Sequence, residues 1–196
     1  LELLTRGSLE CPPELQGLPR PIVGCTGQIS YSYDWKQIGE LASAFPSATF
    51  VFVGPVFPES PEVAAPRLRA FGLPNVRHVP AQPHDRLPQF WNHFDVCLNP
   101  LTVNDHNDRR SPLRLFDYLA TGKPILSTAI REAYEHLPHV VVARSTEESI
   151  EALREMFAGR VMVDRKARLA YLEKHTWNVR AETMLSQLNG AASLTE

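Results

Sequence analysis

The run from Ser111 to Ile125 contains side chains whose types and spacing suit an anion and a diol. Ser111 is a suitable N-cap, and Pro112 fits the first helical position, where its missing N–H costs nothing. The free N–H groups of a first helical turn attract anions, and Arg114 would add a charged fork to the same anion. Asp117 follows about one turn later, and its carboxylate is an acceptor suited to a diol such as ribose. Together these features predict a nucleotide-binding helix start.

Simpler interpretations of the same residues remain open. Arg114 and Asp117 lie three positions apart and could pair along the helix, which would contribute about 0.2–0.5 kcal/mol. Arg109 and Arg110, just before the run, fit a solvated loop as well as they fit a binding site. Gly122-Lys123-Pro124 predicts a helix C-cap followed by a strand, and we do not interpret it as a phosphate-binding loop.

An alternation of strands and helices from Pro21 onward must position these residues. It predicts an α/β fold of the Rossmann-like type, in which a mostly parallel sheet lies between helices on both faces. The predicted strands are residues 22–26, 49–53, 76–79, 95–99, 125–128 and 140–142. Three predicted helices are marked by their first residues: one capped by Asp34, one opened by Asp85 and one that begins in the run from Ser111. The other predicted helices span residues 62–71, 146–157, 164–173 and 177–188.

The polar or glycine-rich segments each follow a predicted strand. They are residues 27–34, 80–85 and 99–111. In open parallel sheets ligands bind at the carboxyl ends of the strands. We therefore expect these three loops to meet at one edge of the sheet.

The chain organisation predicts one principal domain with short flanking segments. Residues 1–20 are expected to be an extended linker, 21–188 the Rossmann-like domain and 189–196 a tail. The chain begins with Leu1 instead of methionine, which we interpret as the mark of a fragment.

Composition excludes several classes of function. Of the 196 residues 43% are hydrophobic, enough for a substantial core, and the net charge of -2 comes without a Lys/Arg-rich block, so nucleic-acid binding is unsupported. No apolar run is long enough to span a bilayer, and no signal peptide is recognisable. Cys25 and Cys97 lie in apolar runs and are expected to be small buried side chains without disulfides. The seven histidines show no metal-binding spacing.

Read together, several segments resemble the C-terminal, donor-binding domain of GT-B glycosyltransferases, in the retaining family-4-like group. The segments are residues 22–27 leading to Asp34, 50–55, 73–76, 87–100 and 112–124. The last resembles the family pattern Pro-x-Lys-x-x-Glu-Tyr-Leu-Ala-x-Gly-Lys-Pro. The resemblance covers about residues 21–188, and its ordered set of motifs is more specific than any single one.

The resemblance implies a role for individual positions. Gly27 and Gln28 would lie beside the donor diphosphate, and a loop including Pro80, Ala81 and Gln82 would bind the nucleobase largely through backbone groups. Ser111, Pro112, Leu113 and Arg114 would frame the phosphates. Asp117 would bind the ribose in place of the family's longer glutamate.

Two departures from the family pattern concern charge. Relatives often carry a glutamate eight positions before the ribose-binding acid, where this chain has Arg109. They often also carry two basic residues in the loop after the first strand, whereas residues 28–33 of this chain include no basic side chain. We expect Arg109 and Arg110 to supply the missing phosphate charge. The catalytic residues would then be Arg114 and Arg109, which stabilise the departing diphosphate without a metal.

The resemblance predicts the donor-binding part of a glycosyltransferase that uses a nucleoside diphosphate sugar in bacterial cell-surface polysaccharide or glycoconjugate synthesis. The acceptor site would belong to a missing N-terminal domain of the same polypeptide, so the fragment would bind donor without turnover. No metal or other cofactor is expected. The predicted location is the cytoplasm, either free or peripherally at the inner face of the membrane. Membrane contact is expected only indirectly, through the other domain or a lipid-linked acceptor. Two alternatives remain: a non-catalytic GT-B-like interaction module, and a nucleotide-sugar epimerase-like domain, for which residues 104–110 are a poor match.

Overall fold

The computed structural model describes residues 10–192. Residues 1–9 of the predicted linker and 193–196 of the predicted tail lie outside the described residues. The chain forms two compact units, one ending at Val163 and the other beginning at Asp164. The second unit holds two helices, α9 (Arg165–Glu173) and α10 (Trp177–Ala192), and the Asp164 side chain caps α9 by accepting from the N–H of Ala167 at 2.9 Å.

The first unit is built on a sheet in which every strand pairing is parallel, in the order β3-β2-β1-β4-β5-β6. The strands are β1 (Ile22–Thr26), β2 (Thr49–Val53), β3 (Val76–Val79), β4 (Val96–Asn99), β5 (Ile125–Thr128) and β6 (Val141–Ala143). The predicted α/β fold is confirmed. Four strands match their predicted ranges, whereas β4 and β6 begin one residue later than predicted.

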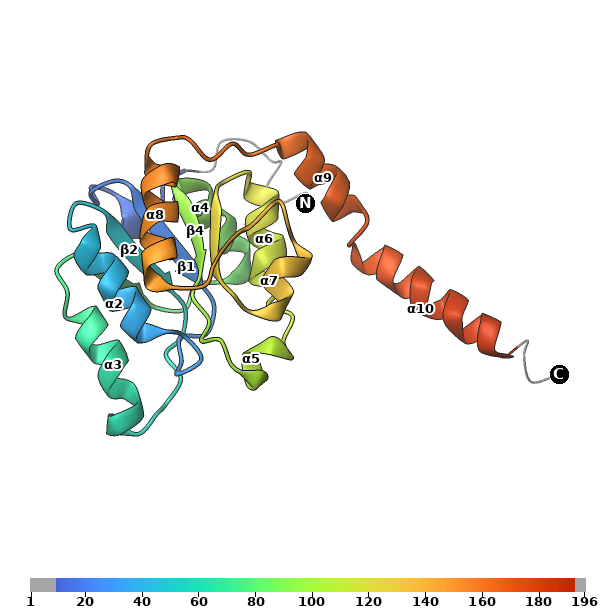
Figure 1. The fold of residues 1–196 in the computed structure, drawn as a ribbon, viewed down its shortest axis with the longest axis horizontal. Helices are drawn as coiled ribbons and strands as arrows, with labels where there is room; N and C mark the ends of the chain where they lie inside the picture. The colour runs from blue at the N-terminus through green and yellow to red at the C-terminus, as the bar shows by residue number, and fades with distance from the viewer. Residues whose placement is uncertain (1–9, 193–196) are drawn as a thin grey trace. The chain divides into compact units, whose positions relative to one another are not determined.

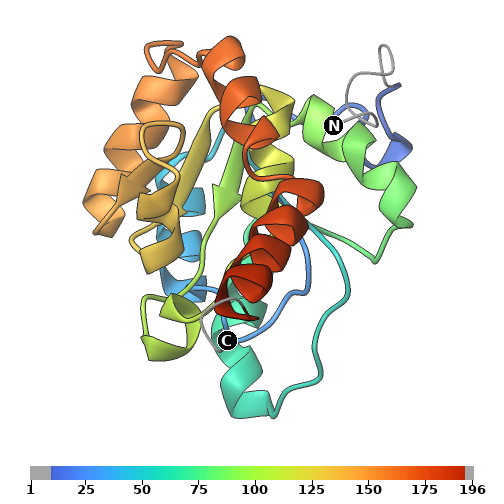
Figure 2. The same ribbon diagram turned by 90° about the vertical axis from the view of Figure 1, so that its right-hand side faces the viewer.

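Helices cover both faces of this sheet (Figures 1 and 2). On one face α2 packs against α3 and α8, and on the other α4 packs against α6. The helices of the first unit are η1 (Pro13–Leu15), α2 (Trp35–Ala44), α3 (Pro61–Phe71), η2 (His84–Arg86), α4 (Leu87–His93), α5 (Asp105–Asp108), α6 (Arg114–Thr121), α7 (Arg131–Glu135) and α8 (Thr146–Phe157). Because both faces are covered, every residue of β1 and β2 is buried.

Local sequence signals explain several element ends. Asp34 caps α2 as predicted, since its carboxylate accepts from the N–H of Gln37 at 2.9 Å. Gly122 ends α6 in the left-handed conformation, with φ of 71°, as the Gly-Lys-Pro pattern predicts. The side chain of Asn75, just before β3, donates to the carbonyls of Ala42, Phe45 and Ala48 and so joins β3 to the end of α2.

The start of α6 differs from the prediction. The helix begins at Arg114, its N-cap is Leu113, and no side chain caps it. Ser111 is therefore not the cap and Pro112 is not the first helical residue. The Ser111 hydroxyl instead donates to Glu132 Oε1 at 2.7 Å, because α7 lies beside this loop. Hydrophobic periodicity does not predict the short helices α5 and α7, since each is too short to show a period.

Candidate functional site

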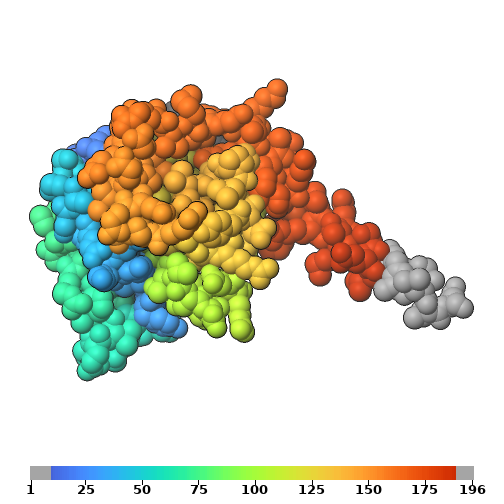
Figure 3. Space-filling view, in the orientation of Figure 1, coloured from blue at the N-terminus to red at the C-terminus, as the bar shows by residue number. Residues whose placement is uncertain are grey.

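The candidate site lies where the strand order reverses, between β1 and β4. The loops after these two strands are joined by backbone hydrogen bonds: Asp34 N–H donates to Pro100 O at 2.8 Å and Thr102 N–H donates to Ser32 O at 2.9 Å. Figure 3 shows the yellow-green segment of α5 beside the blue loop that follows β1. Crevices at such a reversal are the usual ligand sites of open α/β sheets.

Gly27 ends β1 in a conformation that side chains rarely adopt, with φ of 127°. Its N–H donates to Val53 O at 2.9 Å, which ties the turn to β2. A Cβ added here would lie 2.9 Å from Nη2 of Arg114. Glycine is thus required both by the backbone conformation and by the close approach of a guanidinium. The structure brings Gly27 and Arg114 together.

The Arg114 side chain is held by one edge and leaves its other edge without a partner. Nη1 donates to the phenol oxygen of Tyr33 at 2.6 Å and to Cys25 Sγ at 3.3 Å. Nη2 and Nε have no hydrogen-bond acceptor among the described residues, and they are the atoms nearest to Gly27 together with Cζ. A guanidinium edge offers two parallel N–H donors, the geometry that suits a phosphate or carboxylate.

Tyr33 is an almost fully buried acceptor for this arginine. Burial raises the pKa of Tyr33 well above its ordinary value, although the charge of Arg114 opposes that effect. The phenol therefore stays neutral at physiological pH and leaves the positive charge of Arg114 uncompensated. A partly buried charge attracts anions more strongly than the same charge in bulk water.

A second tyrosine fixes α6 against the end of β1. The phenol oxygen of Tyr118, which is fully buried, accepts from Thr26 N–H at 2.8 Å. The Thr26 hydroxyl in turn accepts from Trp91 Nε1 at 2.9 Å. These bonds connect α6, β1 and α4, so they set the position of Arg114 relative to the turn at Gly27.

The first turn of α6 also offers backbone donors. Within the described residues the N–H groups of Leu113 and Arg114 donate to no backbone acceptor, and Pro112 has none to offer. Unpaired N–H groups and the positive end of the helix dipole both favour an anion at this point. The predicted anion-binding helix start therefore keeps its donors, although Ser111 does not cap it.

Asp117 lies one turn further along α6 and is half-buried. Burial raises the pKa of this carboxyl above its usual value, while the nearby charges of His84 and Arg114 oppose the shift. His84 belongs to η2, after β3, so α6 faces the loop in which the nucleobase is expected. No ion pair joins Asp117 to Arg114 in the part of the chain that the structure describes, which argues against simple pairing along the helix.

The loop after β3 presents mainly backbone groups. Pro80 and Ala81 are exposed, whereas the Gln82 side chain folds back, donating to Pro80 O at 3.2 Å and accepting from Arg86 Nη1 at 2.6 Å. Backbone recognition of a base at Pro80, Ala81 and Gln82 stays a prediction.

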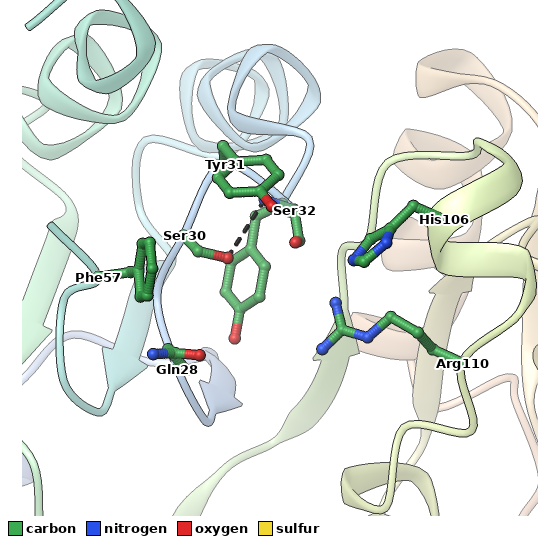
Figure 4. A pocket seen from close by; sticks show the side chains of 8 residues that line it. Gln28, Ser30, Tyr31, Ser32, Phe57, His106 and Arg110 are labelled. Atoms are coloured by element: carbon green, nitrogen blue, oxygen red, sulfur yellow. Dashed lines mark hydrogen bonds between the residues drawn. The ribbon is translucent and has the colours of Figure 1, made fainter. Parts of the chain in front are cut away.

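The structure separates the two arginines that precede α6. Arg110 lines a hollow of about 310 Å³, with Gln28 on the opposite side (Figure 4), and Tyr33 also lines it. Arg109 does not line this hollow; it borders a neighbouring one with Asp105 and Arg110. The structure thus brings Arg110 and not Arg109 to the loop that follows Gly27. The catalytic role predicted for Arg109 stays a prediction.

Residues 10–192 show neither a metal-binding cluster nor a membrane-spanning helix. No group of three or more His, Cys, Asp or Glu side chains in this range is placed to hold a metal ion. The predicted independence from metals stays a prediction. No helix in the same range combines the length and the apolar character needed to cross a membrane.

Comparison with known proteins identifies the family. Residues 36–186 match the family model described as glycosyl transferase-like. The chain belongs to the glycosyl transferase-like family. A relative in Bacillus subtilis (strain 168), the putative teichuronic acid biosynthesis glycosyltransferase TuaH, is 35% identical over 115 residues, which make up 58% of this chain and 28% of the relative.

Solved structures of glycosyltransferases share the fold. Sucrose-phosphate synthase from Thermosynechococcus elongatus aligns with a TM-score of 0.69 at 16% identity, over 93% of this chain and 52% of that one. HepE from Anabaena, solved in complex with UDP and glucose, aligns with a TM-score of 0.67 at 13% identity, over 88% of this chain and 49% of that one. The glycosyl transferase-like chain therefore has the fold of one half of a GT-B enzyme, and it spans about half or less of each of these proteins.

Proposed function

We propose that this chain is the donor-binding half of a glycosyltransferase and binds a nucleoside diphosphate sugar between β1 and β4. The observation that carries the proposal is the unpaired edge of Arg114 against Gly27, beside the free N–H groups that begin α6. In this arrangement Arg114 and the helix start bind the diphosphate, and Gln28 lies next to it.

The other end of the nucleotide lies toward β3 in this proposal. Asp117 accepts from the ribose hydroxyls, and its shorter side chain suits a ribose held close to the helix. Backbone groups of Pro80, Ala81 and Gln82 bind the base. That HepE was solved with UDP makes uridine the first base to test.

In the transfer reaction the bond between the anomeric carbon and the β-phosphate oxygen breaks, and the departing diphosphate keeps the electron pair. The anomeric carbon bonds to an acceptor hydroxyl, whose proton is released. Arg114 and the N–H groups of α6 stabilise the charge that develops on the diphosphate, and no metal is needed for that step. The acceptor site belongs to a preceding domain, which is consistent with the share of the relatives that this chain spans.

The relative in Bacillus subtilis, whose name places that protein in teichuronic acid biosynthesis, supports a proposal for the biological setting. We infer synthesis of a bacterial cell-surface polysaccharide at the cytoplasmic side of the membrane, with membrane contact through the acceptor or the other domain.

Calorimetric titration of the chain with UDP, GDP, ADP and TDP tests the proposal. We expect saturable binding of one diphosphate, weakened about 10- to 100-fold by Arg114→Gln, because a charge-assisted hydrogen bond contributes about 1.5–3 kcal/mol. Asp117→Ala should weaken it as well. Arg154→Gln, which removes the same charge from an exposed position on α8, is the matched control.

Absence of binding to all four diphosphates by a folded chain would contradict the proposal and favour a non-catalytic interaction module. Binding that survives both Arg114→Gln and Asp117→Ala would place the nucleotide elsewhere on the molecule.

A further inference from the structure

The hollow that Arg110 lines combines aromatic, hydroxyl and amide groups with a positive charge. Tyr31 and Phe57, exposed by 56% and 42%, present aromatic rings on the loops after β1 and β2. Hydroxyl and amide groups come from Ser30, Ser32 and Gln28, and His106 stands with Arg110 on the α5 side (Figure 4). No carboxylate is among the described residues that line it.

The Arg110 guanidinium is oriented by a buried asparagine. Nη1 donates to Asn107 Oδ1 at 3.1 Å, and the amide of Asn107 donates to Thr102 O at 2.7 Å and to Ser32 O at 3.2 Å. Asn107 is fully buried, so it connects α5 rigidly to the loop after β1. The remaining N–H groups of the guanidinium have no acceptor among the described residues, and Figure 4 shows the group pointing across the hollow toward Gln28.

The position of the hollow relative to Arg114 decides which part of a donor it would hold. Tyr33 lines the hollow and also accepts from Arg114, and Gln28 lines it directly after Gly27. A diphosphate bound at Gly27 and Arg114 would therefore carry its sugar into this space. Its volume of about 310 Å³ suits a single glycosyl unit.

The charge of the lining points to the class of sugar. Hydroxyl groups of neutral sugars are well bound by carboxylate acceptors, which the described lining lacks. An arginine with free parallel donors instead matches a carboxylate in a bidentate arrangement. We propose that the donor sugar is acidic, and that Arg110 binds its carboxylate while Asn107 positions Arg110. This inference rests on the proposed function.

Titration with a matched pair of nucleotide sugars tests the inference. The pair is built on the base that the diphosphate screen selects; for uridine it is UDP-glucuronate and UDP-glucose, which differ only at C6. We expect the wild-type chain to bind the glucuronate at least about 10-fold more tightly, because one charge-assisted contact distinguishes the two ligands. Arg110→Gln should abolish this preference, and any loss of affinity for the plain diphosphate should be smaller than the loss of affinity for the glucuronate. Arg154→Gln should retain the preference.

Three results would overturn the inference while leaving the proposed function intact. The first is equal affinity of the wild type for the two nucleotide sugars, and the second is a preference for glucuronate that survives Arg110→Gln. The third is an equal loss of affinity for the plain diphosphate and for the glucuronate in Arg110→Gln, which would assign Arg110 to the phosphates. Absence of diphosphate binding would instead contradict the proposed function and this inference with it. Asn107→Ala separates positioning from contact: it should reduce the preference for glucuronate without changing diphosphate affinity.

Discussion

The phenol oxygen of Tyr33 accepts a hydrogen bond from Arg114 Nη1 at 2.6 Å, although the two residues are 81 positions apart in the sequence. The tyrosine comes from the loop after β1 and the arginine from the start of α6. Because one edge of the guanidinium is held by Tyr33 and Cys25, the other edge is directed to Gly27. A cation held in advance in this way loses little side-chain entropy when an anion binds.

Removal of the Tyr33 hydroxyl should release Arg114. In Tyr33→Phe the buried Nη1 loses its oxygen acceptor and keeps only Cys25 Sγ, so we expect the free energy of unfolding to fall by about 1–3 kcal/mol. Diphosphate affinity should fall by roughly 10-fold, since the guanidinium is no longer oriented. Urea unfolding and calorimetry measure the two effects. Tyr134→Phe, on the exposed surface of α7, is the control and should change neither.

A methyl group at Gly27 should disturb both the turn and the site. Gly27→Ala must adopt φ near 127° and place Cβ against Arg114, so we expect a loss of about 1–3 kcal/mol in unfolding free energy and weaker diphosphate binding. Gly39→Ala is the matched control: Gly39 lies in α2 and its added Cβ meets nothing within 4 Å. That variant should be stabilised by up to about 1 kcal/mol. An unchanged or higher stability of Gly27→Ala would show that the turn relaxes freely.

Asp117 should make the stability of the chain depend on pH in the acidic range. Because burial raises the pKa of this carboxyl in the folded chain, its ionisation costs stability. The stability that the protonated carboxyl contributes is fully present below the pKa of the unfolded chain, and it is lost as pH rises through the pKa of the folded chain. Asp117→Asn cannot ionise, so the unfolding free energy of the variant minus that of the wild type should increase with pH. Urea unfolding from roughly pH 4 to pH 7 measures the difference, and a difference independent of pH would contradict the expectation.

At neutral pH, Asn75→Asp should lower the free energy of unfolding more than Asn75→Ala does. Its amide donates to three carbonyls that end α2 and begin β2. Asn75→Ala should cost about 1–3 kcal/mol in unfolding free energy through unpaired acceptors. Asn75→Asp removes the donors and adds a negative charge facing the same carbonyls, so its loss should be larger at neutral pH and smaller in acid. Equal losses for the two variants at every pH would exclude this account.

Chelation should leave nucleotide binding unchanged. In the proposed site Arg114 and the N–H groups at the start of α6 supply the positive charge that a divalent cation supplies in other phosphate sites. We therefore expect the same diphosphate affinity with EDTA and with added Mg²⁺, measured by calorimetry in one buffer. An affinity that rises several-fold with Mg²⁺ and is lost with EDTA would require a metal in the complex.

The elements that the sequence predicts correctly are those set by local interactions. Short local sequence patterns predict β1, β2, β3 and β5 to the residue, and Asp34 caps α2 through a contact only three positions away. The predicted start of α6 is wrong because a contact distant in the sequence decides it. The Ser111 hydroxyl could bond either to its own helix or to Glu132, and it bonds to Glu132 because α7 lies beside it.

The amino-acid sequence by itself determined the order of strands and helices, the glycine at the end of β1 and the arginine and aspartate of α6, because periodicity, turn chemistry and caps act over a few residues. Only the tertiary structure decided that Tyr33 holds Arg114, that Tyr118 ties α6 to Thr26, and that Arg110 and not Arg109 faces Gln28. These relationships join segments far apart in the chain. They depend on how the loops after β1 and β4 pack, and no spacing within one segment records that packing.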